Sequence, residues 1–303
     1  MLQSTKRTRR WILSRTALAG AGGLLVPRLH PQGAATTDET AWRIGCFTRP
    51  WDKYDYRVAL DAITEAGFKY VGLMTTESRT HLVISVETTL EEAKEVGEEC
   101  EQRGLKVASV YGGDIPVAES TAKGIEGLKR LIDSCEAAHA SNLMMGGVVD
   151  QVLYEPYFHA IAECSDYAAG KGIGISMKPH GGLNTTGPEC RKAVEKVGKT
   201  NFRIWYDPGN IFYYSDAKLD PLDDAATVDG LVVGMSVKDY RHPKDVMLTP
   251  GTGQVDFPRV FARLKQGGFT AGPLIVECLK LGDLPQLLEE AKKARRFVED
   301  LVA

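Results

Sequence analysis

Short apolar runs alternate with helical patterns along the chain from about residue 42 onward. The apolar runs are bounded by Gly, Pro or charged residues, which is typical of short strands buried in a parallel sheet. The stretches between them repeat apolar residues every three or four positions, as amphipathic helices do. We predict strands at residues 42–47, 70–73, 106–111, 142–145, 173–177, 203–206, 231–237 and 274–277.

Helical patterns fill the connections between these strands. Glycines such as Gly67, Gly104 and Gly172 follow several of them, where a helix C-terminus favours a residue that can adopt a left-handed conformation. Eight strand–helix units in roughly 260 residues predict a closed (β/α)₈ TIM barrel, a single α/β domain spanning 36–303. The helices are expected at 56–66, 89–103, 121–138, 156–171, 188–197, 257–266 and 284–301, with a short connection near 221–228.

An open, doubly wound sheet is the alternative architecture. It favours a Gly-rich phosphate-binding turn directly after the first strand. The first predicted strand instead runs into Cys46-Phe47-Thr48-Arg49-Pro50-Trp51, and the Gly-rich cluster 20–23 precedes every predicted strand. The sequence therefore favours the barrel.

The net charge of −3 conceals an uneven distribution. Residues 1–35 carry six basic residues and no acidic one, which leaves 31 basic against 40 acidic residues in the remainder. An acidic body repels polyanions, so we expect neither nucleic acid nor an anionic membrane surface as a partner. The six basic residues of the N-terminal segment are Lys6, Arg7, Arg9, Arg10, Arg15 and Arg28.

The N-terminal segment resembles an export signal. Arg9 and Arg10 precede an apolar, Gly-rich stretch at 16–26, the order found in twin-arginine signals. That stretch is shorter than the ~20 residues of a membrane span, and no later segment is long enough. We therefore predict a twin-arginine-type signal peptide at 1–35, a periplasmic location, and no membrane association after its removal.

Six scattered cysteines form no Cys-x-x-Cys pair, which argues against a zinc knuckle or a thioredoxin-type site. Cys46 and Cys278 lie near the ends of the first and last strands, which a barrel brings together. The sequence leaves open whether they are paired, as it leaves open the oligomeric state, a homo-oligomer included.

In a TIM barrel, the catalytic groups lie where strands end and their loops begin. Strand five ends at Lys178 and His180, strand six at Trp205, Asp207 and Asn210, strand seven at Ser236, Lys238 and Arg241, and strand eight at Glu277.

Four of these segments carry a family resemblance. The turn at 207–210 (Asp-Pro-Gly-Asn), the run at 236–239 (Ser-Val-Lys-Asp), the loop at 251–257 (Gly-Thr-Gly-Gln-Val-Asp-Phe) and the strand ending at Glu277 occur in the expected order. They resemble the sugar phosphate isomerase/epimerase family of xylose isomerase-like TIM barrels.

The resemblance implies a divalent metal, Mn²⁺, Mg²⁺ or Zn²⁺, held by Glu, Asp, His and Glu from strands five to eight. Asp207 and Glu277 match the second and fourth ligands. Lys178 stands in place of the first Glu, and Ser236 in place of the His. Because two carboxylates hold a hard cation only with further oxygen ligands, we expect the metal site to be altered or absent.

A metal-free alternative uses the lysines. Period-two alternation directs Ser236 and Lys238 to the same face of strand seven. Lys178 and Lys238 would then stabilise a developing enolate, or one of them, with a lowered pKa, would act as a base, with Glu277 or Asp207 as the complementary acid or base. We assign Lys178, Lys238 and Glu277 as catalytic residues, His180, Asn210, Arg241 and Trp205 as substrate-binding residues, and Asp207 with Glu277 as an incomplete metal set.

Three functions are compatible with the resemblance. The first is a carbohydrate-active isomerase, epimerase or lyase that removes a proton next to a carbonyl of a free sugar, keto-sugar or glycoside. The second is an exported sugar-binding relative without catalysis. The third, an abasic-site nuclease, would need a His-rich metal cluster and a basic face, which the sequence lacks.

Overall fold

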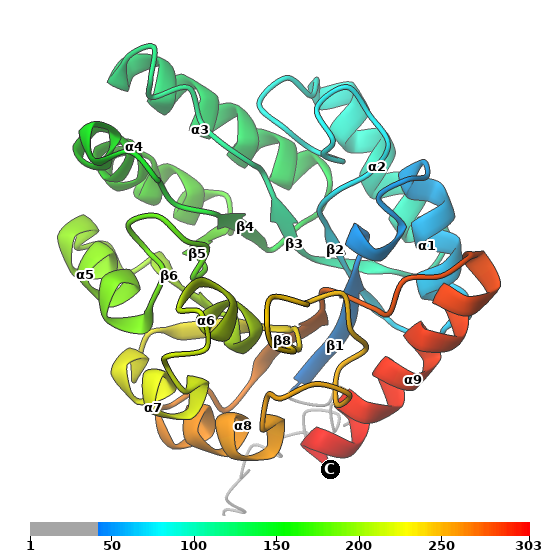
Figure 1. Ribbon diagram of the computed structural model, residues 1–303. Helices are drawn as coiled ribbons and strands as arrows, with labels where there is room; N and C mark the ends of the chain where they lie inside the picture. The colour runs from blue at the N-terminus through cyan, green and yellow to red at the C-terminus, as the bar shows by residue number, and fades with distance from the viewer. Residues whose placement is uncertain (1–41) are drawn as a thin grey trace, which may run out of the picture. The chain divides into compact units, whose positions relative to one another are not determined.

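Eight parallel strands close into a barrel in the computed structural model, which describes residues 42–303 (Figure 1). The strands follow the chain order around the barrel, and β8 pairs with β1 to close it, with Gly45 opposite Ile275. The strands are β1 (Trp42–Phe47), β2 (Tyr70–Leu73), β3 (Lys106–Tyr111), β4 (Asn142–Met145), β5 (Gly174–Met177), β6 (Phe202–Tyr206), β7 (Val232–Val237) and β8 (Gly272–Val276).

Helices surround the barrel and cover the outward faces of its strands (Figure 1). Most begin at a residue whose side chain accepts a backbone N–H of the first turn, as Ser120 and Asp283 do, so the sequence marks their starts. They are α1 (Tyr56–Glu65), α2 (Leu90–Gln102), α3 (Thr121–Ala137), α4 (Gln151–Gly170), α5 (Gly187–Val197), α6 (Pro208–Tyr214), α7 (Pro221–Ala225), α8 (Phe257–Gln266) and α9 (Leu284–Val302), with short 3₁₀ turns at Arg49–Trp51 and Ala226–Val228.

The barrel interior is filled by bulky side chains. The Trp205 ring lies flush against Gly234 of the neighbouring strand, where an added Cβ would come within 2.4 Å of the ring. Only glycine leaves room for the indole there. The interior cluster comprises Phe47, Met74, Ala108, Met144, Trp205 and Ile275, and it forms the floor on which the polar groups at the strand ends rest.

The predicted barrel is confirmed, and so is the order of its strands. One helix prediction was wrong in detail, and one helix was not predicted. Helix α4 begins at Gln151 rather than at Pro156, because Asp150 caps it by accepting from Val152 N and the proline lies inside the helix. Helix α6 was not predicted. No helix among residues 42–303 is long and apolar enough to cross a membrane. The predicted signal peptide lies outside the described residues.

Candidate active site

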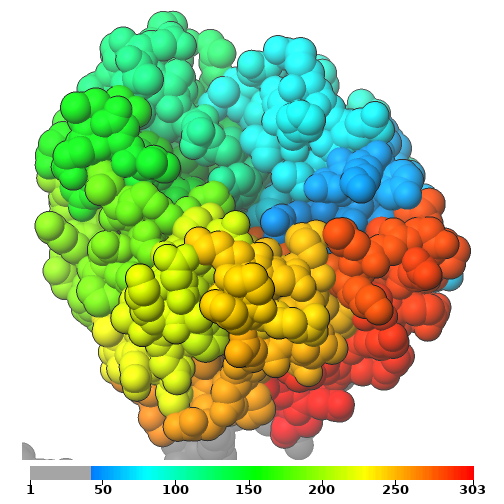
Figure 2. Space-filling model, in the orientation of Figure 1, coloured from blue at the N-terminus to red at the C-terminus, as the bar shows by residue number. Residues whose placement is uncertain are grey.

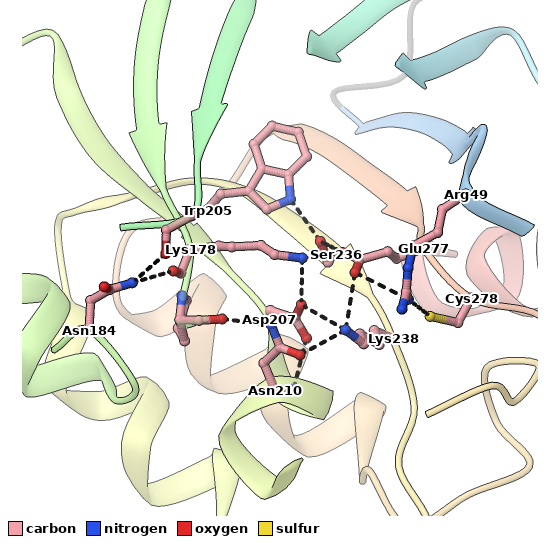
Figure 3. A network of polar contacts seen from close by, with 12 residues as sticks. Arg49, Lys178, Asn184, Trp205, Asp207, Asn210, Ser236, Lys238, Glu277 and Cys278 are labelled. Atoms are coloured by element: carbon pink, nitrogen blue, oxygen red, sulfur yellow. Dashed lines mark hydrogen bonds and ion pairs between the residues drawn. The ribbon is translucent and has the colours of Figure 1, made fainter. Parts of the chain in front are cut away.

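Two lysines and two carboxylates meet at the C-terminal ends of β5 to β8 (Figure 3). Lys178 Nζ lies 2.7 Å from Glu277 Oε2 and 3.3 Å from Asp207 Oδ2. Lys238 Nζ lies 3.1 Å from Glu277 Oε1 and 3.9 Å from Asp207 Oδ2. All four side chains are almost completely buried, so these attractions act with little screening by water.

Neighbouring groups fix the orientation of this ion cluster. Ser236 Oγ donates to Glu277 Oε2 over 2.7 Å, and Trp205 Nε1 donates to Ser236 Oγ from the barrel interior over 3.2 Å. Asn210 accepts from Lys238 Nζ over 2.7 Å and donates to the carbonyl of Pro179. These contacts tie β5, α6, β7 and β8 to one another at the cluster.

Arg49 adds a third cation from the turn after β1. Its Nη1 lies 3.6 Å from Glu277 Oε1 and donates to the Cys278 sulfur (Figure 3). Burial raises the pKa of the Cys278 thiol, so the sulfur stays protonated and supplies no counter-charge to Arg49. The ion-pair partner of the guanidinium is the Glu277 carboxylate, which both lysines also contact.

A cavity of about 210 Å³ opens above the cluster. In the filled view, the blue segment after β1 and the yellow-to-gold segments that carry α6 and the loop after β7 meet near the centre of one face (Figure 2). The volume is below the roughly 300–1,000 Å³ of sites for drug-sized ligands, which suits a single sugar unit. The lining residues are Arg49, Met74, Thr75, Tyr111, Lys178, His180, Asn210, Tyr213, Tyr214, Lys238, Val246 and Glu277.

His180 is held over this cavity by a tight turn. Gly181 and Gly182 adopt φ of 87° and 63°, and a Cβ on Gly181 would lie 2.7 Å from the Tyr214 ring. The imidazole has Tyr111 and Tyr214 as ring neighbours at centroid distances of 6.1 and 5.8 Å. Burial, reinforced by Lys178, lowers the pKa of His180 from 6.5 to about 4, so the ring is neutral near pH 7.

The environment shifts the other titratable groups in different directions. Burial alone would lower the pKa of Lys178, but Glu277 and Asp207 outweigh it and raise that pKa. The base role that requires a lysine with a lowered pKa is therefore not available to Lys178. Burial opposes ionisation of Glu277, yet Lys178, Lys238 and Arg49 hold its pKa well below the usual value. Burial raises the pKa of Asp207.

The donor set does not fit the divalent metal that the resemblance implies. Both oxygens of Glu277 already accept from cationic or hydroxyl donors, and Asp207 Oδ1 accepts from Asn210 N. Lys178 Nζ lies within reach of both carboxylates, where a metal ion would have to bind. Within residues 42–303, no three His, Cys, Asp or Glu side chains are grouped to hold a metal ion.

Asp239 serves the loop after β7. Its carboxylate accepts from the backbone N–H groups of Tyr240, Gly251, Gly253 and Val255 at 2.7–3.1 Å. These four hydrogen bonds fold residues 240–255 into a loop beside the cavity. Val246 of this loop lines the cavity. Asp239 and its chain neighbour Lys238 do not pair with each other, since Lys238 contacts Asn210 and Glu277 while Asp239 accepts from the loop backbone.

The structure brings Lys178, Lys238, Glu277, Asp207, His180 and Asn210 together, and it separates two predicted residues from the cavity. Arg241 is 53% exposed and donates to the Thr252 carbonyl, because the capped loop carries it outward. Trp205 is fully buried below Ser236, since it lies one full pleat repeat, two residues, before Asp207 at the end of the same strand. Neither side chain is placed to contact a ligand in this cavity.

Sequence reasoning missed Arg49 and Tyr111. Both stand at the C-terminal ends of strands, after β1 and at the end of β3, so the rule applied to strands five to eight would have found them. Asn184 was missed as well. It donates to the carbonyls of Lys178 and Gly146 and accepts from Val148 N, which fixes the end of β5, but no sequence pattern marks such a contact.

Solved structures of low sequence identity share this fold. A xylose isomerase domain protein from Planctomyces limnophilus aligns at 20% identity and a TM-score of 0.67, covering 86% of this chain and 97% of that one. A D-psicose 3-epimerase aligns at 14% identity and 0.68, covering 86% and 99%. A probable 3-DHS dehydratase from Bacillus anthracis aligns at 14% identity and 0.63, covering 85% and 98%.

Among curated proteins, none matches the chain significantly. The family model described as xylose isomerase-like TIM barrel matches residues 60–301, which include seven of the eight strands and the whole of the lysine–carboxylate cluster. The chain therefore belongs to the xylose isomerase-like TIM barrel family.

Proposed function

We propose that the protein is a carbohydrate-active isomerase, epimerase or lyase. It removes a proton from the carbon beside a carbonyl group of a free sugar, a keto-sugar or a glycoside. The observation that carries this proposal is the placement of Lys178, Lys238 and Arg49 around Glu277 at the cavity floor. The likeness to an epimerase and to a probable dehydratase supports the same reaction class.

The cations supply the electrostatic stabilisation that this chemistry requires. Removing a proton next to a carbonyl leaves an electron pair that moves to the carbonyl oxygen and forms an enolate. Fixed ammonium groups beside that oxygen stabilise the new charge without reorganisation of water. Lys178 and Lys238 both line the cavity, and the raised pKa of Lys178 keeps its charge in place throughout.

His180 is the group best suited to accept the proton. Its ring lines the cavity, and the lowered pKa leaves it unprotonated near pH 7. Glu277 is less suited, because every donor that surrounds it weakens it as a base. A general base must be unprotonated and within reach of the substrate, and His180 meets both conditions.

Three outcomes share this first step. In isomerisation, His180 returns its proton to the former carbonyl carbon, while the hydroxyl group of the deprotonated carbon gives its proton to the enolate oxygen and becomes the new carbonyl. In epimerisation, solvent supplies a proton to the original carbon on its opposite face, and His180 releases its proton to solvent. In elimination, the carbonyl re-forms, the electron pair of the enolate double bond moves between the deprotonated carbon and the next one, and the hydroxyl group of that next carbon leaves as water with the proton that His180 took up. The step common to all three is the removal of one carbon-bound hydrogen.

A sugar-binding protein without catalysis is the second candidate. The replacement of two ligand positions by Lys178 and Ser236, in a cavity that keeps its polar lining, favours it. The predicted periplasmic location, which stays a prediction, argues for free sugars or glycosides over sugar phosphates in either case.

Hydrogen exchange in D₂O separates the two candidates. A panel of ketoses, keto-glycosides and sugar acids is incubated with the protein, and proton NMR follows the loss of carbon-bound hydrogen signals. We expect exchange that is lost in Lys178→Met and His180→Asn and retained in Lys94→Met, an exposed lysine on α2. Binding of a sugar without any exchange would support the binding protein instead.

A further inference from the structure

The charges at the cavity do not balance. Among residues 42–303, the cavity lining carries three cationic side chains, Arg49, Lys178 and Lys238, and one carboxylate, Glu277. Behind the lysines, the Asp207 carboxylate forms ion pairs with both of them, at 3.3 and 3.9 Å, and is counted as the second negative charge. His180 is neutral near pH 7, so the cavity retains a surplus of one positive charge.

Three other acids lie near the cavity. Asp52 influences Arg49 and Asp114 influences Tyr111, but both carboxylates are exposed to solvent, where water screens them. Asp239 is buried, but its carboxylate faces the loop after β7, where it accepts from four backbone N–H groups and not from a cation of the cavity. A positive charge held in a buried site without a partner is unfavourable, and a bound anion removes that penalty.

We propose that the substrate is a sugar acid whose carboxylate binds to Arg49. This inference rests on the proposed function and names its substrate class. A carboxylate carries the single negative charge that the cavity lacks, whereas a phosphate ester carries close to two near pH 7. The planar guanidinium also presents paired N–H donors that match the two oxygens of a carboxylate.

The two oxygens of Glu277 contact different cations, which gives the cavity one side for the substrate's carboxylate and another for its carbonyl. Arg49 and Lys238 approach Oε1, while Lys178 and Ser236 approach Oε2. The carboxylate of the substrate belongs on the Oε1 side, where the Arg49 side chain is 27% exposed and the two lysines are at most 6% exposed. The carbonyl belongs on the side of Lys178.

Matched pairs of ligands test this inference by calorimetry. Each carboxylate of a panel of aldonates, uronates and 2-keto aldonates is titrated beside its uncharged amide, since the two differ mainly in charge. We expect the best carboxylate to bind about 10- to 100-fold more tightly than its amide, the range of a charge-assisted hydrogen bond. Arg49→Gln removes this preference, and Arg259→Gln, an exposed arginine on α8, keeps it.

Several outcomes would overturn the inference. They are equal binding of carboxylates and amides throughout the panel, tighter binding of inorganic phosphate or sugar phosphates, and a preference that survives Arg49→Gln. The D₂O exchange assay keeps this result apart from the proposed function. Carboxylate-selective binding without exchange contradicts the enzyme alone, while exchange on neutral sugars without carboxylate preference contradicts the sugar-acid inference alone.

Discussion

Lys178 at the end of β5 and Glu277 at the end of β8 face each other across the mouth of the barrel at 2.7 Å. Both side chains are buried. Replacing one of them by a neutral residue leaves the charge of the other buried without its nearest partner, which is unfavourable. This pair links the stability of the barrel to the chemistry of its cavity.

Lys178→Met is expected to lower the free energy of unfolding by about 3 kcal/mol, because Glu277 and Asp207 then lie buried with fewer positive neighbours. Urea unfolding measures the change, and Lys94→Met should stay within about 0.5 kcal/mol of the original protein. In a double-mutant cycle, adding Glu277→Gln should cost less than the sum of the two single changes. Additive costs would contradict a direct coupling of Lys178 to Glu277.

His180 should make stability depend on pH. The imidazole takes up a proton near pH 6.5 in the unfolded chain and only near pH 4 in the folded protein. The unfolded state therefore binds more protons in that interval, and stability falls as the pH decreases from 6.5 to 4. The expected loss from this group is about 3 kcal/mol. His180→Asn should remove that part of the pH dependence, and parallel curves for both proteins would contradict a buried neutral imidazole.

The same ring predicts the pH profile of the reaction. If His180 accepts the proton, the rate constant kcat/KM should stay level above about pH 5 and fall tenfold per pH unit below about pH 4, as the free protein becomes protonated. Rates are compared at constant ionic strength in the interval where the protein remains folded. An acid limb centred near pH 6.5 would show that a different or more exposed group carries the proton.

Asp239→Asn tests whether the Asp239 carboxylate holds the loop at residues 240–255 in place. The amide keeps the shape of the side chain but loses its charge and one of its acceptor positions, so some of the N–H groups of residues 240–255 lose their partner. We expect a cost of about 2–4 kcal/mol in the free energy of unfolding. Hydrogen exchange should show faster exchange at Gly251 and Gly253, while Asp256→Asn at the start of α8 leaves them protected.

The metal site of the family can be rebuilt as a test of its replacement. In the double variant Lys178→Glu, Ser236→His, carboxylate and imidazole ligands stand at all four strand ends, and the ammonium group between Asp207 and Glu277 is gone. We expect this variant to retain Mn²⁺ or Zn²⁺ after dialysis at a level above that of the original protein, measured by elemental analysis. A full equivalent of tightly bound metal in the original protein would contradict the conclusion that Lys178 and Ser236 leave no site for a divalent metal.

Replacement of Arg9 and Arg10 by lysine tests the predicted export signal. A twin-arginine receptor reads the arginine pair itself, so the double replacement should keep the protein in the cytoplasm although the charge is unchanged. Fractionation of cells that express the two forms measures the distribution. Replacement of Arg15 by lysine, outside the pair, serves as the control, and equal export of all forms would refute a twin-arginine signal.

The periodicity of the sequence was sufficient to predict the barrel, because every strand is a short apolar run and all but the sixth are followed by a helical pattern. Helix α6 escaped prediction, since seven residues are too few to show a helical period. The sequence nevertheless marks where this helix begins, because Asp207 caps it and Pro208 occupies its first position.

The site was predictable where strand alternation fixes direction and unpredictable where loops do. Lys178, Asp207, Lys238 and Glu277 follow from the strand ends alone. Arg241 belongs to a loop whose path depends on the four bonds of the Asp239 carboxylate, which no local pattern reveals. Trp205 lies below the rim because it precedes Asp207 by two residues, each of which adds about 3.3 Å along the strand, and the residue type alone does not show this depth.

Glu277 receives its donors from segments that are synthesised far apart: the turn after β1, the end of β5 and the end of β7. It lies just past β8, at the seam where that strand pairs with β1. Before β8 has paired with its neighbours, Lys178, Lys238 and Arg49 lack this common counter-charge. Ordering of the upper rim of the barrel should therefore require closure of the seam between β8 and β1.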